Sequence, residues 1–115
     1  MAFLERDLMR KWIKHIEESE PEADVRRVEE SPNGIKPYDV QVLRKDAKSR
    51  GCGCGHSYAY EFKRWTKKRK PLTRESALAL LTAHQRYFLE KHKAAGGTSI
   101  VYVFTRDQGP FVVEL

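Results

Sequence analysis

The string Tyr60-Glu61-Phe62-Lys63-Arg64 holds the residue types best suited to chemistry. In a β-strand, residues two apart point to the same face, so Glu61 and Lys63 would stand side by side, with Cα atoms about 7 Å apart, while Phe62 enters the core. Upstream, Asp39 lies on a segment that would pair with this one in a hairpin, which can bring its carboxylate next to that of Glu61. Two adjacent carboxylates suit Mg²⁺, which takes one or two protein carboxylates and fills its other octahedral positions with water and phosphate.

A lysine beside such a metal site could orient or activate the attacking water, so the set predicts metal-assisted hydrolysis of a phosphodiester. Taken alone, Glu61-x-Lys63 is weak evidence, because alternating charges are common on the outer face of a hairpin strand. The combination of Asp39 with Glu61 and Lys63 across a hairpin favours the catalytic interpretation. Asp46, in the string KDAKS, is a fallback for Asp39, and its place near the hairpin tip makes it the poorer candidate.

A strongly basic segment follows the candidate catalytic strand. The string KRWTKKRKPLTR, residues 63–74, contains basic residues and no acid, with Trp65 in its middle as a stacking or packing surface. Such a loop would hold DNA phosphates and read little sequence; the alternative is a charged run that only keeps the surface soluble. The predicted DNA-binding residues are Arg64, Lys67, Lys68, Arg69, Lys70 and Arg74, joined by Arg6, Arg10 and Lys11 near the N-terminus.

The elements that must position these residues follow from the periodicity of apolar side chains. Apolar residues at three- and four-residue steps predict a first amphipathic helix, and Thr73 predicts the start of a second, about 30 Å long, that ends at Gly96. Alternating or continuous apolar runs predict strands, two of them joined in a long hairpin with a Gly-rich tip. The expected order is a helix at 3–18, strands at 23–29, 38–43 and 57–65, a helix at 74–95, and strands at 98–104 and 111–115.

Length and composition limit the possible classes of protein. The chain has 115 residues, 40% hydrophobic and 33% charged, so we expect one folded domain spanning residues 1–115. Its net charge of +6 favours an anionic partner, nucleic acid first. No apolar run is long enough for a membrane span or a secretion signal. We therefore expect a cytoplasmic, nucleoid-associated protein with no membrane partner and no small-molecule substrate.

The two cysteines, Cys52 and Cys54, are too few for a disulfide framework, which fits a reducing compartment. With His56 they provide zinc-ligand types, but three ligands so close in sequence make a poor tetrahedron. A flexible Gly-rich tip is the default interpretation. A zinc site completed by a second chain or by DNA is the alternative.

On these residues the sequence resembles the PD-(D/E)xK nuclease superfamily, with Pro37-Tyr38-Asp39 followed by Glu61-Phe62-Lys63 in an α-β-β-β-α-β order. Within it, the chain is most similar to the Holliday junction resolvases, over nearly its whole length except the Gly-Cys tip. Two departures make Asp39 the less secure assignment: Tyr38 separates it from Pro37, and the hairpin tip lengthens the spacing to Glu61. Glu5 resembles the N-terminal helix glutamate of archaeal Hjc-type resolvases, and His84-Gln85, Gly96-Gly97 and Phe104 resemble the second half of the bacterial RecU-type enzymes.

The resemblance implies a restriction-endonuclease-like α/β fold, a mixed β-sheet flanked by helices. It also implies a Mg²⁺-dependent endodeoxyribonuclease, with Mn²⁺ able to substitute, that makes paired nicks in four-way DNA junctions during recombination and repair and leaves 5′-phosphates. Because two symmetric cuts need two active sites, it implies a homodimer. The alternatives are another nuclease of the superfamily, such as a nicking, mismatch or fork-specific nuclease, and an inactive junction-binding module. The carboxylates argue against the inactive binding module, because without a metal they would repel the DNA phosphates.

The site roles are carried over from the same resemblance. Asp39, Glu61 and the backbone carbonyl of Phe62 would hold the metal, and Lys63 would hold the water or stabilise the developing charge. Glu5 would add a catalytic or metal-binding carboxylate, directly or through water, or else pair with a nearby arginine on an exposed helix. Two further residues complete the set: Gln85 reaches the active site or makes a structural hydrogen bond, and Ser31 contacts DNA or is a plain turn serine.

Overall fold

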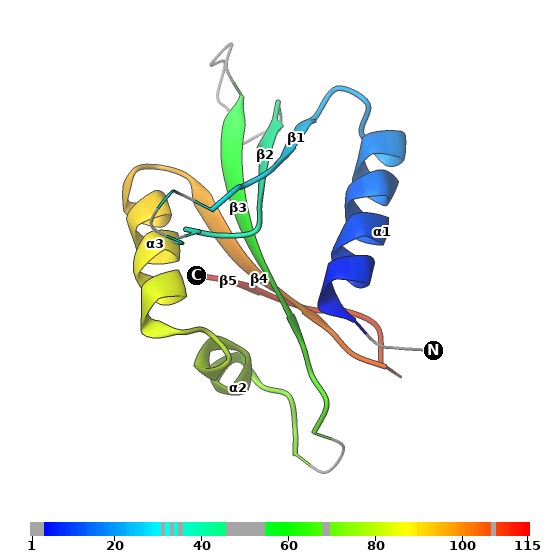
Figure 1. Ribbon diagram of the computed structural model, residues 1–115, viewed down its shortest axis with the longest axis vertical. Coiled ribbons are helices and arrows are strands. Elements are labelled where there is room, and N and C mark those ends of the chain that lie inside the picture. The colour runs from blue at the N-terminus through cyan, green and yellow to red at the C-terminus, as the bar shows by residue number, and fades with distance from the viewer. Residues whose placement is uncertain are drawn as a thin grey trace.

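The computed structural model describes residues 4–30, 32, 34, 36–45, 55–67, 70–106 and 108–115. Its five-stranded sheet has the order β1-β2-β3-β4-β5, with β3 and β4 parallel and the other neighbours antiparallel. The expected α/β class, a mixed sheet flanked by helices, is confirmed (Figure 1). The elements are α1 (Glu5–Ser19), β1 (Asp24–Arg27), β2 (Val40–Arg44), β3 (His56–Arg64), α2 (Arg74–Ala79), α3 (Ala83–Ala94), β4 (Thr98–Phe104) and β5 (Phe111–Glu114).

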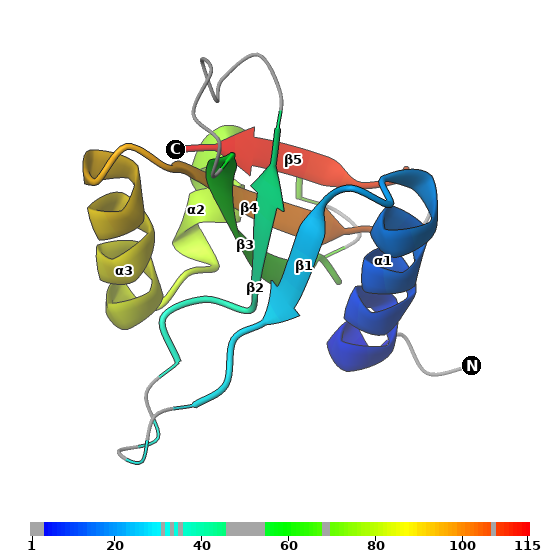
Figure 2. The same cartoon turned by 90° about the horizontal axis from the view of Figure 1, so that it is seen from above.

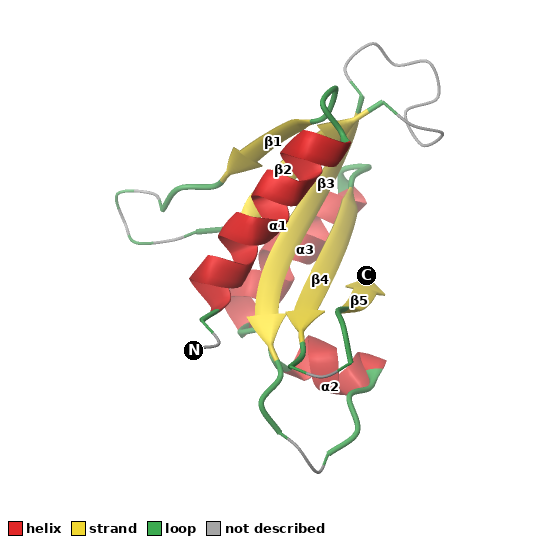
Figure 3. Cartoon of the chain, turned by 90° about the vertical axis from the view of Figure 1, so that its right-hand side faces the viewer, coloured by secondary structure: helices red, strands yellow, loops and turns green. Residues whose placement is uncertain are grey.

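Helix α1 covers one face of the sheet through the apolar stripe that the sequence predicts. Met9, Trp12 and Ile16 recur at steps of three and four, so they line one side of the helix and are buried. The Trp12 ring lies 4.6 Å from that of Tyr60 and 5.0 Å from that of Phe62, measured between centroids. Figure 3 shows α1 crossing in front of the long strands. This aromatic contact fixes which way β3 faces.

Helices α2 and α3 cover the opposite face of the sheet. Leu89 of α3 and Ala77 of α2 are fully buried against Val101 and Val103 of β4. Seen from above, α1 and α3 lie on opposite sides of the sheet (Figure 2). The continuous apolar run of β4 is fully buried at Val101 and Val103, on the face under α2 and α3, but only partly buried on the face toward α1, so the predicted burial on both faces holds in part.

The expected single long helix over residues 74–95 is wrong, because the chain forms two helices there. Helix α2 ends at Ala79 and α3 begins at Ala83. Between them, the Thr82 hydroxyl accepts a hydrogen bond from the Gln85 backbone N–H at 3.1 Å, and the Gln85 side-chain oxygen accepts one from the Thr82 N–H at 3.0 Å. This reciprocal pair is a capping box, which starts a new helix inside an otherwise helical pattern.

The expected hairpin is confirmed: β2 and β3 pair antiparallel, with Val40 opposite Tyr60 and Arg44 opposite His56. Its tip and some residues of the basic segment lie outside the described residues. None of the helices described is long and apolar enough to cross a membrane. The predicted residues outside the described ranges are Ser31, Asp46, Cys52, Cys54, Lys68 and Arg69.

Candidate active site

Asp39 lies one residue before β2, and its carboxylate replaces a missing backbone acceptor. Its backbone N–H donates to the Tyr60 carbonyl at 3.0 Å and its carbonyl accepts from the Val28 N–H at 2.9 Å, which holds the residue between two neighbouring segments. Where the β2 ladder ends, the Phe62 N–H donates instead to Asp39 Oδ2 at 2.8 Å. The side chain is buried, 8% exposed. The carboxylate is therefore fixed against β3 beside Glu61.

Glu61 and Lys63 lie on the same face of β3, and Phe62 between them packs under α1, as the alternation of a strand requires. Glu61 Oε1 lies 3.8 Å from Lys63 Nζ. Glu61 is only 2% exposed, and its Oε2 is buried with no hydrogen-bond partner among the described residues. A buried acceptor without a donor costs about 1–3 kcal/mol, so this oxygen is in place for a cation or donor that arrives from outside.

Lys36 is a site residue that the sequence patterns did not indicate. Its Nζ lies 2.7 Å from Asp39 Oδ1, and its side chain is about one-third exposed. The lysine is three residues before Asp39, in the string Lys36-Pro37-Tyr38-Asp39, and that spacing was the available signal. The ammonium group of Lys36 thus places a positive charge on Asp39, which is a predicted metal ligand.

The electrostatics of the site reflect crowding of buried carboxylates. The pKa of Glu61 is raised to about 8, mainly by burial and next by the nearby Asp39 carboxylate, while Lys63 opposes the shift. Burial is also the main reason that the pKa of Glu5 is raised, with Lys63 acting against it and Asp39 adding to it. Glu5, at the start of α1, therefore shares the field of Asp39 and Lys63, although it comes from the helix on the other face of the sheet.

The residues present fit a magnesium ion better than a structural zinc. Asp39 and Glu61 offer hard oxygen donors, and Glu61 Oε2 is a buried acceptor that lacks a partner in the described chain. Across the described ranges, no three His, Cys, Asp or Glu side chains come together to hold a metal. A role for Glu5 as a metal-binding carboxylate, directly or through water, stays a prediction. Two carboxylates suffice for Mg²⁺, which keeps several waters, whereas structural zinc takes four protein ligands.

The remaining predicted catalytic residue, Gln85, makes the structural hydrogen bond that the sequence left open. Its side-chain oxygen closes the capping box of α3. A catalytic role for Gln85 stays a prediction. His56, the third member of the alternative zinc set, places its Nε2 at 2.7 Å from the hydroxyl of Thr98 within the sheet.

The predicted DNA-binding residues that the structure describes are all exposed. They come from the first turns of α1, from the end of β3, from the segment before α2 and from the first residue of α2. Arg74 also ties α2 to β5, since its guanidinium donates to the Glu114 carbonyl at 2.8 Å. The described members are Arg6, Arg10, Lys11, Arg64, Lys67, Lys70 and Arg74.

Comparison with known proteins shows which solved structures have a similar fold. No family model matches the chain, and no curated protein matches it. Among solved structures, the chain is similar to Archaeoglobus fulgidus Hjc, a Holliday junction resolvase from an archaeal hyperthermophile, with a TM-score of 0.54 and 17% identity over 91% of this chain and 72% of that one. It is also similar to SSO0001, with a TM-score of 0.46 and 15% identity, covering 94% of this chain and 48% of that one. The chain thus has an α/β fold similar to that of the resolvase Hjc.

Proposed function

We propose that this protein is a metal-dependent endodeoxyribonuclease acting on branched DNA, with the four-way junction as its substrate. The observation that carries the proposal is the pair of buried carboxylates, Asp39 and Glu61, beside Lys63. A protein that only binds DNA gains nothing from burying two acids together next to phosphates. The likeness in fold to Hjc supports the choice of substrate, because that protein is a Holliday junction resolvase.

In the proposed reaction, Mg²⁺ bound at the two acids would polarise the scissile phosphate and lower the pKa of a bound water. Asp39 is held for this task by the Phe62 N–H, and Glu61 by its burial in β3. Lys63, next to Glu61, would position the attacking water and stabilise the negative charge that develops on the phosphate. Lys36 would leave Asp39 Oδ1 and neutralise phosphate charge nearby.

The exposed cations on α1 and after β3 would hold the DNA arms by their phosphates, which agrees with recognition of shape over sequence. Two symmetric nicks in one junction need two active sites. We therefore propose a homodimer as the active form.

The test compares cleavage of a synthetic four-way junction with that of linear duplex of the same sequence, with Mg²⁺, with Mn²⁺ and with chelator. The variants are Glu61→Gln and, as a matched control, Glu90→Gln. Gln keeps the shape of Glu61 and removes only the charge, whereas Glu90 is an exposed glutamate of α3 that pairs with Arg86 at 3.2 Å. We expect Glu61→Gln to lower the cleavage rate more than about 100-fold. Losing a residue that only hydrogen-bonds to a metal ligand costs about 10- to 100-fold, and loss of the ligand itself should cost more. Glu90→Gln should cut like the wild type.

The outcomes separate the alternatives. Paired nicks in the junction alone, dependent on metal and on Glu61, would support a resolvase. Equal cutting of duplex, forks or mismatched DNA would support a nuclease but reject the four-way junction as its specific substrate. Tight junction binding without cleavage in either metal would reject the enzyme in favour of a binding module.

A further inference from the structure

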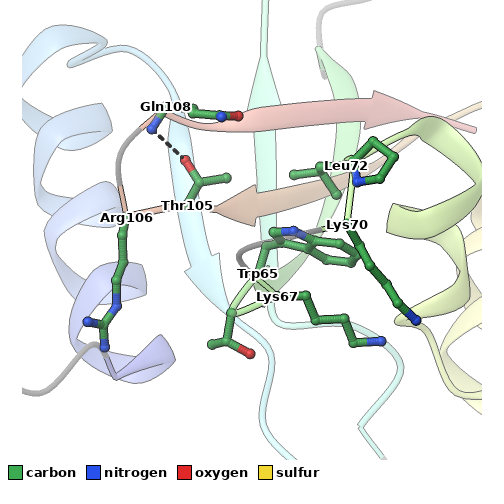
Figure 4. Close-up of a pocket in the computed structure, with 9 residues that line it drawn as sticks. Trp65, Lys67, Lys70, Leu72, Thr105, Arg106 and Gln108 are labelled. Atoms are coloured by element: carbon green, nitrogen blue, oxygen red, sulfur yellow. Dashed lines mark hydrogen bonds between the residues drawn. The ribbon is translucent and has the colours of Figure 1, made fainter.

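A cavity of about 460 Å³ lies beyond the end of β3, between the segment that follows this strand and the connection from β4 to β5. Figure 4 shows Trp65 with Lys67, Lys70 and Leu72 on one side of it, and Thr105, Arg106 and Gln108 on the other. Its size falls within the range of about 300–1,000 Å³ that small-molecule sites occupy. The lining residues that matter below are Trp65, Lys67, Lys70, Leu72, Arg106 and Gln108.

Trp65 gives the cavity a flat aromatic wall that the fold holds in place. Its backbone N–H donates to the Phe104 carbonyl at 2.9 Å, which continues the pairing of β3 with β4 by one residue. The partly buried ring, together with Leu72, packs against the core under α2 and α3. The backbone hydrogen bond and this packing therefore hold Trp65 against the core.

The rim of the cavity is cationic. Lys67 Nζ lies 5.6 Å from the centroid of the Trp65 ring, and the exposed residues Lys70 and Arg106 come from opposite sides of the opening. On the β4–β5 side, the Thr105 hydroxyl donates to the Gly109 carbonyl and accepts from the Gln108 N–H, which closes the turn. Gln108 adds an amide, which can both donate and accept hydrogen bonds.

An aromatic wall surrounded by cations and an amide matches one kind of ligand, a nucleotide. The base would stack on the indole, and the phosphates on either side of it would meet the cations. Trp65 follows Lys63 by two residues, about 7 Å of extended chain, so the cavity is next to the candidate active site. A base can reach it only when it is not stacked and paired inside a duplex.

We propose that this cavity, the Trp65 pocket, binds the base of an unpaired nucleotide adjacent to the phosphate that is cut. The inference rests on the proposed nuclease function and deepens it: selectivity for branched DNA comes from capture of a base that is unstacked at a branch point. Linear duplex presents no such base, so it would lose this contact and keep only its phosphate contacts.

The first test measures binding of single nucleotides without metal or cleavage. Deoxyadenosine 5′-monophosphate is added to the ¹⁵N-labelled protein, and the two indole N–H signals are followed by NMR. Trp12, on the buried face of α1 and only 9% exposed, serves as the internal reference. We expect the Trp65 signal to shift with the nucleotide and to shift much less with deoxyribose 5-phosphate. Equal shifts with the two probes would show a phosphate site without base recognition, and no shift at millimolar nucleotide would also overturn the proposal.

The second test uses a junction and matched duplex, with binding measured in chelator. Stacking of a base on an aromatic side chain contributes about 10- to 100-fold in Kd, so Trp65→Ala should weaken junction binding by that factor and leave duplex binding nearly unchanged. Trp65→Phe, which keeps an aromatic wall and the packing, should restore most of the loss. Tyr87→Ala, which removes a 57% exposed aromatic residue on α3, is the matched control and should bind both DNAs like the wild type.

Failure of this inference can be distinguished from failure of the proposed function. If Trp65→Ala weakens binding to junction and duplex equally while the wild type still cleaves DNA, the inference about the pocket is wrong and the proposed nuclease function stands. A protein that binds the nucleotide at Trp65 but cuts no DNA in any metal would have the pocket without the enzyme.

Discussion

Replacing His92 should make the folding stability less dependent on pH, because this histidine is held neutral by a defined hydrogen-bond network. The Ser99 hydroxyl donates its one proton to the Leu89 carbonyl at 2.6 Å, so at 3.1 Å it can only accept from His92 Nδ1–H. On the other side, Ser57 Oγ lies 2.9 Å from His92 Nε2 and accepts from the Gln41 amide at 2.9 Å. Ser57 therefore donates to Nε2, and the neutral ring carries its proton on Nδ1.

Protonation of Nε2 would break this arrangement, because Ser57 would face two donors and lose its own acceptor. Burial lowers the pKa of His92 from its ordinary value of 6.5, and the nearby His56 lowers it further. Since the pKa is lower in the folded state, the unfolded state binds more protons in acid. The stabilising contribution is thus fully present above pH 6.5 and is lost as the pH falls through the folded-state pKa.

The magnitude follows from linkage. One proton changes the free energy of unfolding by at most about 1.4 kcal/mol per pH unit. Because the ring is only partly buried, solvent screening limits the total to about 1 kcal/mol. This corresponds to a shift of about 0.5 M in the urea midpoint for a domain of this size.

The assay is urea unfolding across the range from about pH 5 to about pH 8 for the wild type, His92→Gln and His84→Gln. His84 is an exposed histidine of the same helix and is the matched control. The stability difference between wild type and His92→Gln should be constant at neutral pH and shrink in acid, whereas His84→Gln should follow the wild type. A difference that stays the same at every pH, or grows in acid, would refute the neutral network.

Two further predictions concern the segment around α3. Thr82→Ala removes the capping box and should lower the free energy of unfolding by about 1 kcal/mol, measured by urea unfolding, with no change in junction binding; an unchanged stability would mean that α3 starts without its cap. Gly97→Ala places a methyl group into the ring of His92, which sits against the Gly97 backbone, and should cost about 1–3 kcal/mol and abolish the acid dependence described for His92. An unaltered pH profile in Gly97→Ala would show that the His92 ring moves aside and still keeps its hydrogen bonds to Ser57 and Ser99.

Much of the fold is readable from the sequence because it depends on local repetition. The steps between Met9, Trp12 and Ile16 predict the face of α1, and the alternation of Glu61, Phe62 and Lys63 predicts which side chains share a side of β3. These patterns need no partner to be recognised. The break between α2 and α3 was also readable, because Thr82 and Gln85 have the spacing of a capping box; the apolar stripe that runs across it hid the signal.

The burial and the partners of the site residues could not be predicted from local sequence patterns. That Glu61 Oε2 is buried without a partner, and that Lys36 sits on Asp39, depend on how β2 ends against β3. The Trp65 pocket joins residues about 40 positions apart, Trp65 and Arg106, which only the parallel pairing of β3 with β4 brings together.

The sequence by itself determined the residue types, the basic surface and the strand on which Glu61 and Lys63 share a face, because each follows from composition or from a period of two. Only the tertiary structure decided which acid gains a raised pKa, which cation meets it and where a cavity opens beside it. The physical reason is that desolvation and close charge pairs arise between segments distant in the chain, and no local pattern encodes the distance between them.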